Sequence, residues 1–283
     1  MKTGLLAISL VAALAAFAVP RVDQDDVSIS ENMNTRKVTI TYRLDDEPAV
    51  ITIDIQTNNT ETGAWESIGG TRMANMSGDV NKLVQNGASR KTVEWRADRD
   101  WPDQDIRGGK VRAVVTAWAT NAPPDWMIVD MAGQKGISYY VTEEAIPFGV
   151  SNSLYKTRYL VMRKVPAAGV EWRMGIEDNY PKSRMHQVAF TEDYYLAIYE
   201  LTQGQYSNAY VAAGMNITGG AVPSDFKNDA DSPMRPVERI TFNEFRGDAS
   251  VYDWPNSTPL HGVDPDSFLG VGVGEVLDNC LKI

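Results

Sequence analysis

Apolar and polar residues alternate with period two in several short runs between residues 25 and 143. The alternating runs lie at residues 38–44, 51–55, 92–96 and 111–118, and a continuous apolar run lies at 126–131. A period of two predicts strands with one buried face. Turn-forming pairs such as Asn58-Asn59 and Gly69-Gly70 separate the runs. The pattern therefore predicts an all-β, two-sheet sandwich over residues 25–143.

The pattern changes after a segment at 144–158, which we interpret as a linker because Pro147 and Gly149 interrupt any period. Thr202 and Gln205 have the spacing of a helix capping box. A helix beginning there would place Tyr206, Ala209, Tyr210 and Ala213 on one face and end at Gly214. Thr241 and Glu244 repeat the box for a second, short helix. With apolar strands before them, these helices predict a partial α+β domain over residues 159–271, followed by an unmatched tail at 272–283.

The first 18 residues have the pattern of a secretory signal peptide. Lys2 precedes an apolar stretch from Leu5 to Phe17, and Ala16-Phe17-Ala18 supplies a small-x-small cleavage pattern. The alternative is a membrane anchor, but the stretch is shorter than the roughly 20 residues that a span needs. We therefore expect an exported bacterial protein that is extracellular, on the cell surface or periplasmic, with no membrane span.

Charge and composition narrow the classes of partner. The 283 residues carry a formal charge of −10, and no basic cluster offsets it. An acidic surface repels phosphate backbones, so we expect no nucleic-acid partner. A protein or a glycan remains as the expected ligand.

The residues that could hold a metal are few. Cys280 is the one cysteine, and His186 and His261 are the two histidines. A single thiol forms no internal disulfide, and a metal site needs three or more converging ligands. We therefore interpret all three side chains as structural or surface residues.

Acidic residues cluster around Trp101 in one predicted loop, at Asp98, Asp100, Asp103 and Asp105. Their oxygens could supply a calcium site, since hard cations take several oxygen ligands. The spacing does not match an EF-hand loop, however, so we expect a solvated turn.

Other short motifs have a functional and a structural interpretation. Trp95, Trp101, Trp118 and Trp126 could line a carbohydrate-binding face, although tryptophans more often pack in cores and edges. Arg246-Gly247-Asp248 spells an integrin-type tripeptide, which we interpret as a turn. Two glycosylation sequons begin at Asn75 and Asn216.

Several motifs after residue 159 occur in a fixed order. An apolar strand at 159–162 leads into Val165-Pro166-Ala167-Ala168-Gly169 and then Met174-Gly175. His186-Gln187-Val188, the aromatic stretch 195–202 and Pro236-Val237-Glu238-Arg239-Ile240-Thr241-Phe242 follow. Over residues 159–245 this order resembles the formylglycine-generating enzyme family, also called the sulfatase-modifying factor domain. The N-terminal pattern resembles fibronectin type III or immunoglobulin-like modules.

The resemblance implies a C-type-lectin-like α+β fold and, in complete members, copper or calcium. Members that oxidise a substrate cysteine to formylglycine use two cysteines in their C-terminal half to hold copper(I), and related members bind iron through a histidine cluster. This chain has no such cysteine pair, and the family's later "R-L-P-T-E-A-E-W-E" motif does not follow Asp266–Val271. We therefore expect the tail at 272–283 to be a truncation or frameshift product.

Two functions follow from this resemblance. The first is an exported binding or structural protein, or a truncated family member, whose sulfatase-modifying-factor-like domain lacks a complete catalytic centre. The alternative is a fragment of an active formylglycine-generating oxidase that acts on a cysteine in a sulfatase-type peptide. On the first interpretation, the sequence assigns no catalytic, cofactor-binding or metal-binding residue and no cofactor.

Overall fold

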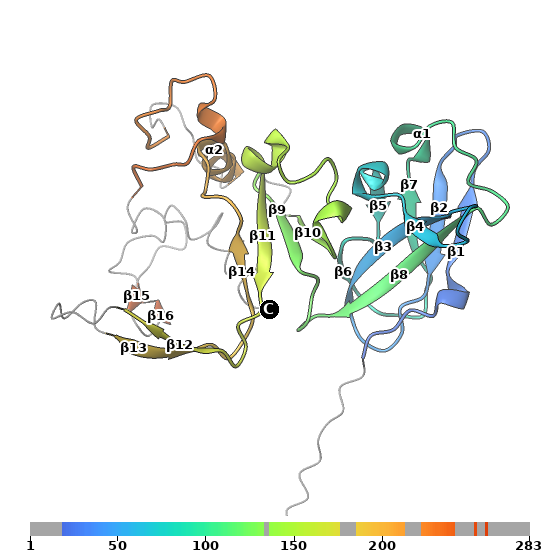
Figure 1. The fold of residues 1–283 in the computed structure, drawn as a ribbon, viewed down its shortest axis with the longest axis horizontal. Helices are drawn as coiled ribbons and strands as arrows, with labels where there is room; N and C mark the ends of the chain where they lie inside the picture. Colours follow the sequence, from blue (N-terminus) through green and yellow to red (C-terminus); the bar gives the residue numbers. More distant parts are fainter. Residues whose placement is uncertain are drawn as a thin grey trace, which may run out of the picture.

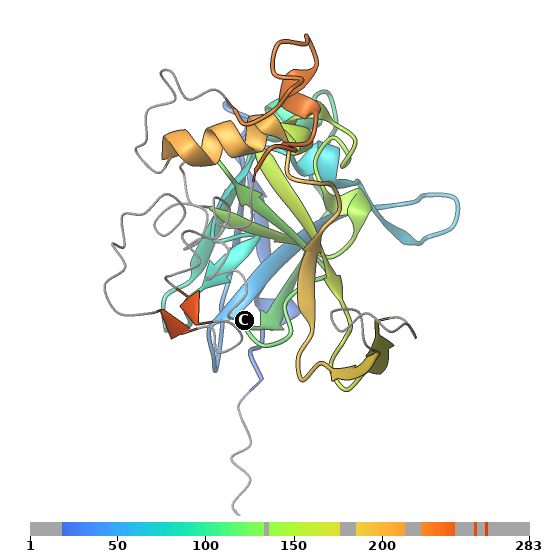
Figure 2. The same cartoon turned by 90° about the vertical axis from the view of Figure 1, so that its left-hand side faces the viewer.

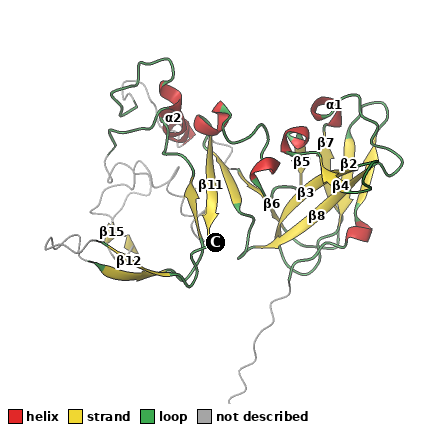
Figure 3. Ribbon diagram, in the orientation of Figure 1, coloured by secondary structure: helices red, strands yellow, loops and turns green. Residues whose placement is uncertain are grey.

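A computed structural model describes residues 19–132, 136–175, 185–212, 222–240, 252–253 and 258–259. In these ranges strands predominate and the helices are short (Figure 3). The predicted β-rich character of the fold is confirmed, and the strands form several antiparallel sheets. The signal-peptide segment 1–18 and the tail 272–283 lie outside the described residues.

The described strands follow the chain in sixteen segments (Figure 1): β1 (Ser28–Glu31), β2 (Val38–Tyr42), β3 (Ala49–Asn58), β4 (Trp65–Ser67), β5 (Met76–Gly78), β6 (Lys82–Val84), β7 (Lys91–Trp95), β8 (Val111–Ala119), β9 (Trp126–Asp130), β10 (Ile137–Tyr140), β11 (Tyr159–Val165), β12 (Glu171–Met174), β13 (His186–Ala189), β14 (Tyr194–Ala197), β15 (Tyr252–Asp253) and β16 (Thr258–Pro259). The described α-helices are α1 (Ala97–Asp100) and α2 (Gln203–Ala212). Short 3₁₀-helices are η1 (Gln24–Asp26), η2 (Gly70–Met73), η3 (Glu143–Ala145), η4 (Ser153–Lys156) and η5 (Ser232–Met234).

Two sheets make up the N-terminal part of the molecule. The first has the strand order β1-β2-β7-β5, and the second joins β4 and β6 to one edge of β3 and β8 to the other. β3 and β8 pair antiparallel along most of their length, from Ala49↔Ala119 to Thr57↔Val111. These long strands carry the period-two pattern that the sequence shows most clearly.

One apolar cluster joins the two sheets. Ile40 and Tyr42 of β2 and Ile51 and Ile55 of β3 are all fully or nearly fully buried in it, as is Trp95 of β7. Each side chain of this size contributes about 1.5–3 kcal/mol through removal of its apolar surface from water. Because neighbouring residues point to opposite faces, the polar residues between them lie on the outer faces.

Strands β10, β9, β11 and β14 form a further antiparallel sheet, in the centre of Figure 1. β9 pairs with β11 from Tyr159↔Asp130 to Arg163↔Trp126. Residues 144–158, the expected linker, separate these strands in sequence, so the expected boundary falls inside a hydrogen-bonded sheet.

The expected linker also contributes to the core. Its Ile146 and Tyr155 are buried against Ile128 and Val161 on one face of the sheet. At its end, Arg158 donates through Nε and Nη2 to the two carboxylate oxygens of Asp130, at 3.0 and 2.7 Å. The turn-forming residues of this segment therefore shape a packed connection.

Strand β9 is apolar at consecutive positions because both of its faces are covered. Met127 and Val129 belong to a cluster on one face, and Trp126 and Ile128 belong to a cluster on the other. A strand buried on both sides needs no polar alternation. This explains the continuous apolar run at residues 126–131.

Helix α2 crosses this sheet near one end of its strands (Figure 2), and Ala209 packs into the cluster beneath it. The predicted capping box is confirmed at the start of the helix. Gln205 N donates to Thr202 Oγ1 at 3.2 Å, and Thr202 N donates to Gln205 Oε1 at 3.0 Å. The buried face is more polar than predicted, since Gln203 and Gln205 are also buried.

Substitution of Gln205 by alanine is expected to lower the free energy of unfolding by about 2 kcal/mol. The amide of Gln205 donates to the carbonyls of Tyr155 and Tyr159 at 3.2 and 2.7 Å, and buried acceptors left unpaired cost about 1–3 kcal/mol. Val211→Ala on the exposed side of α2 is the control, with a change within about 0.5 kcal/mol. Urea unfolding followed by circular dichroism measures both, and equal costs would contradict this role.

The structure bears on only some of the remaining predictions about helices. Among the described residues, no helix combines the length and the apolar character required to cross a bilayer. The second capping box, Thr241 and Glu244, lies outside the described residues. So do Tyr210's side chain and Ala213, which were expected on the apolar face of α2.

Candidate functional site

A cleft of about 460 Å³ lies between the sheet of β3 and β8 and the segment from Tyr140 to Ala145. Thr52 and Asp54 of β3 and Thr116 and Trp118 of β8 line one side of it. The volume falls in the range of about 300–1,000 Å³ that is typical of small-molecule sites. The cleft therefore lies where the N-terminal sheets face the end of β10 and the chain that follows it.

Strand register brings the cleft residues together. Thr52 pairs with Thr116, and Val50 pairs with Trp118. Ile51 and Ile53 point into the apolar cluster, so the residues next to them point outward into the cleft. The same alternation that builds the core therefore also gathers the polar residues of this site.

Hydrogen bonds fix the side chains on the strand side of the cleft. The indole Nε1 of Trp118 donates to Thr52 Oγ1 at 2.9 Å. Ser67 Oγ donates to Asp54 Oδ1 at 2.5 Å, and Gln56 Nε2 donates to Asp54 Oδ2 at 2.8 Å. These bonds hold one indole and one carboxylate in fixed positions facing the cleft.

The opposite side carries Tyr140 and Glu144. Burial raises the pKa of the Tyr140 phenol to about 12, although a hydrogen bond with the Asn81 side chain partly opposes this. Glu144 has a lowered pKa because its own backbone N–H and the Thr142 hydroxyl hydrogen-bond to the carboxylate. At neutral pH this wall therefore presents a neutral phenol and a carboxylate.

The end of the cleft is closed by a close backbone contact between η2 and η3. A Cβ atom added to Gly70 would lie 2.1 Å from the carbonyl oxygen of Ala145, so only glycine fits there. Phe148 N also donates to Thr71 Oγ1 at 3.0 Å. These contacts set the spacing between the two sides of the cleft.

The four tryptophans considered as a binding face do not lie together in this cleft. Trp95 is fully buried, with its ring centroid 6.5 Å from that of Trp101. Trp126 is buried in the sheet of β10, β9, β11 and β14, where Arg163 lies over its ring. Of the four, Trp118 lines the cleft. Core packing accounts for Trp95 and Trp126, as the structural interpretation expects.

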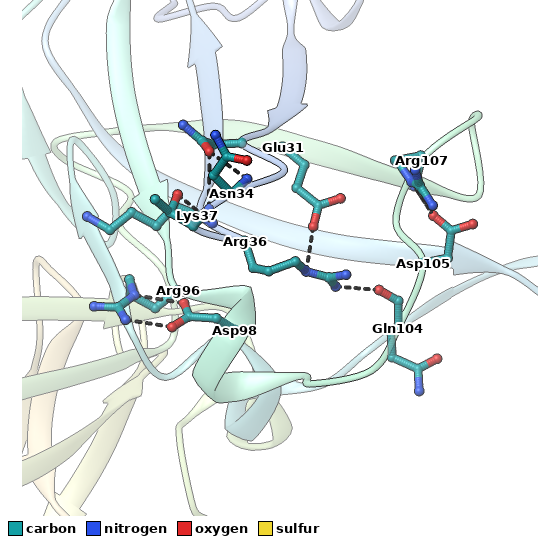
Figure 4. A network of polar contacts seen from close by, with 11 residues as sticks. Glu31, Asn34, Arg36, Lys37, Arg96, Asp98, Gln104, Asp105 and Arg107 are labelled. Carbon is teal, nitrogen blue, oxygen red and sulfur yellow. Dashed lines mark hydrogen bonds and ion pairs between the residues drawn. The ribbon is translucent and has the colours of Figure 1, made fainter.

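The acidic loop residues have separate partners and do not converge. Arg96 pairs with Asp98, and its hydrogen bond lowers the pKa of that carboxyl (Figure 4). Asp105 accepts hydrogen bonds from Lys110 and Arg107, and both contacts lower the pKa of its carboxyl. Figure 4 shows Asp105 beside Arg107. Within the described ranges, no group of three or more acidic, histidine or cysteine side chains could hold a metal ion.

Asp100 has a structural role in this loop. Its carboxylate accepts from the backbone N–H and the side-chain amide of Asn75 at 2.7 and 2.5 Å, and from Trp95 Nε1 at 3.1 Å. The amide nitrogen of the Asn75 sequon is therefore engaged in holding α1 against the core. Sequence reasoning placed Asp100 in a solvated turn and missed these contacts.

Of the other candidate residues, the structure describes His186. His186 lies on β13, exposed and opposite Met174 in the register. Cys280, His261, the tripeptide Arg246–Asp248 and the Asn216 sequon lie outside the described residues.

Residues of the family-like motifs contact one another. The backbone amides of Ala168 and Ala167 donate to Asp193 Oδ1 at 3.0 and 2.9 Å, and they lower the pKa of that carboxyl. Val237 N donates to the carbonyl of Leu201 at 2.9 Å. The segment at 165–169 thus meets Asp193, and the segment at 236–242 meets the aromatic stretch 195–202.

Comparison with known proteins gives no relative: no family model matches the chain, and neither a curated protein nor a solved structure matches it significantly.

Proposed function

We propose that the chain is an exported binding protein that uses the cleft beside β3 and β8 to hold a glycan or a protein segment. The cleft carries this proposal, because it combines apolar side chains such as Trp118 and Met73 with the polar groups of Asp54 and Glu144. A mostly apolar hollow with a few converging polar groups is typical of ligand sites.

The strand order supports an immunoglobulin- or fibronectin-like sandwich as the N-terminal module. Constant-type immunoglobulin domains have one sheet of strands A, B, E and D, and a second in which strand C lies beside strand F. The order β1-β2-β7-β5 corresponds to A-B-E-D, and the pairing of β3 with β8 corresponds to C beside F. Such modules frequently carry binding sites on their surfaces.

The motif contacts around Asp193 and Leu201 support a formylglycine-generating-enzyme-like domain after the first module. We propose that this domain serves binding, since the chain has the single cysteine Cys280 where the oxidases of the family use two. Copper(I) titration with an oxygen-uptake assay on a cysteine-containing sulfatase-type peptide tests this directly. Turnover that depends on the chain would overturn the proposal.

Substitution of Thr116 by arginine is expected to weaken ligand binding at least tenfold. Thr116 is exposed on β8 and faces the cleft, so a long charged side chain fills the space without entering the core. A glycan array and a peptide library, probed with the full chain, identify the ligand. Thr92→Arg, at a position on β7 that is also exposed, is the matched control and should bind normally. If both variants bound the ligand equally well, the cleft would not be its binding site.

A further inference from the structure

We infer that the ligand of this cleft is a neutral saccharide of mono- or disaccharide size. The inference rests on the proposed function, because it names the ligand class of the same cleft. It follows from the combination of one fixed indole, several hydroxyl groups and two carboxylates without a basic partner among the lining residues.

The apolar part of the cleft suits the C–H face of a sugar ring. The Trp118 indole lines the cleft while it also packs against the apolar cluster that contains Met127 and Val129 of β9. Its N–H is already bonded to Thr52, so the indole offers an apolar surface in a fixed orientation. Met73 and Val114 extend this apolar surface.

The polar part of the cleft suits hydroxyl groups, which both donate and accept hydrogen bonds. Each oxygen of the Asp54 carboxylate accepts one bond within the protein, and a carboxylate has about four acceptor positions in total. The hydroxyl of Thr52 accepts from Trp118 and has its own hydrogen left to donate. Thr116 adds a further hydroxyl directly across the strand pair. Acceptors and donors thus alternate along the sheet side of the cleft.

Charge selects between ligand classes. Among the described residues that line the cleft, Asp54 and Glu144 are acidic and none is lysine or arginine. An anionic ligand would be repelled by both carboxylates in a partly desolvated site. A cation without hydroxyl groups would interact with them favourably, but it could not accept the hydrogens that the Thr52 and Thr116 hydroxyls have left to donate. A neutral polyol meets both requirements.

Titration of the full chain with saccharides, followed by tryptophan fluorescence and calorimetry, tests this inference. The probes are cellobiose, maltose and N,N′-diacetylchitobiose as neutral disaccharides, a galacturonic acid dimer as the anion, and a chitosan dimer as the cation. We expect at least one neutral disaccharide to bind and the anionic dimer to bind at least tenfold more weakly. Asp54→Asn and Trp118→Phe should each weaken saccharide binding at least fivefold, whereas Trp172→Ala on the distant β12 should not.

The possible outcomes separate this inference from the proposed function. Binding of a peptide or of the cationic dimer that Thr116→Arg abolishes, with no neutral saccharide bound, would overturn the inference and leave the cleft as a binding site. Saccharide binding that is unchanged in Thr116→Arg and Asp54→Asn would overturn both. Failure of every probe, array glycan and library peptide to bind would also overturn both. Thermal melts of each variant confirm that the fold is retained.

Discussion

Replacement of Trp95 by alanine is expected to lower the free energy of unfolding by about 3–5 kcal/mol, the range for large aromatic side chains in cores. Trp95 is fully buried between the two N-terminal sheets. Its Nε1 also donates to the carbonyl of Arg72 at 3.0 Å and to Asp100 at 3.1 Å. The substitution therefore leaves a cavity and removes the partner of two acceptors.

Two further variants separate these contributions. Trp95→Phe retains most of the ring and removes the N–H, so we expect a cost of about 1–3 kcal/mol. Trp65→Ala is the matched control, because Trp65 is a half-buried residue on β4 and Arg112 Cζ lies 4.5 Å from the centroid of its ring. A cation–π contact at such a site contributes about 0.5–1 kcal/mol. Urea unfolding of all three measures these costs, and equal losses in the two alanine variants would refute the central role of Trp95.

The long strands could be predicted from sequence because their signal is local. Ile51, Ile53 and Ile55 alternate with polar residues over β3, so the sequence alone assigns them to the buried face. In the structure, β3 pairs with β8 along this stretch. Strands as short as β5 and β6, with three residues each, contain too little of a period to be recognised. Their place in the sheets is determined by the longer strands beside them.

Partners distant in sequence could not be predicted by the same reasoning. Nothing local in β9 indicates that it pairs with β11 across residues 144–158. The glycine and proline residues of that segment indicate turns, yet Ile146 and Tyr155 are buried within it. Burial of these two side chains is a tertiary effect, which is why a packed connection resembled a linker.

One side of the candidate cleft could be predicted from the sequence, and the other side could not. Outward alternation on β3 and β8 already places Thr52, Asp54 and Trp118 on one face in the sequence pattern. What lies over that face depends on the chain after β10, which returns so that Ala145 meets Gly70. Gln205 shows the opposite case, since its capping spacing was readable but its bonds to two distant carbonyls were not.

Alkaline pH is expected to unfold the protein through buried tyrosines. Burial raises the pKa of Tyr140 to about 12 and raises those of Tyr42, Tyr155 and Tyr195 further. The hydroxyls of Tyr42 and Tyr155 donate to the carbonyls of Asp79 and Pro147 at 2.6 and 2.8 Å, and that of Tyr195 donates to Pro124. A phenolate can donate no hydrogen bond, so ionisation also breaks these contacts.

The direction of the effect follows from proton linkage. A tyrosine with a raised pKa in the folded state binds its proton more tightly there than in the unfolded chain. Its contribution to stability is complete below pH 10 and is lost as the pH rises through the folded-state pKa. For Tyr140 alone, the shift from 10.0 to about 12 corresponds to a loss of about 3 kcal/mol at high pH. The other three tyrosines add losses of the same sign.

The test is a pair of titrations on the full chain between pH 8 and pH 12.5. We expect the free energy of unfolding to fall steeply above pH 10, and part of the tyrosinate absorbance to appear only as circular dichroism reports unfolding. Tyr140→Phe and Tyr42→Phe should each make the fall shallower, because each removes one ionisable group whose proton the folded state retains. If all tyrosines ionised together near pH 10 while the fold remained intact, the buried hydroxyls would not control alkaline stability.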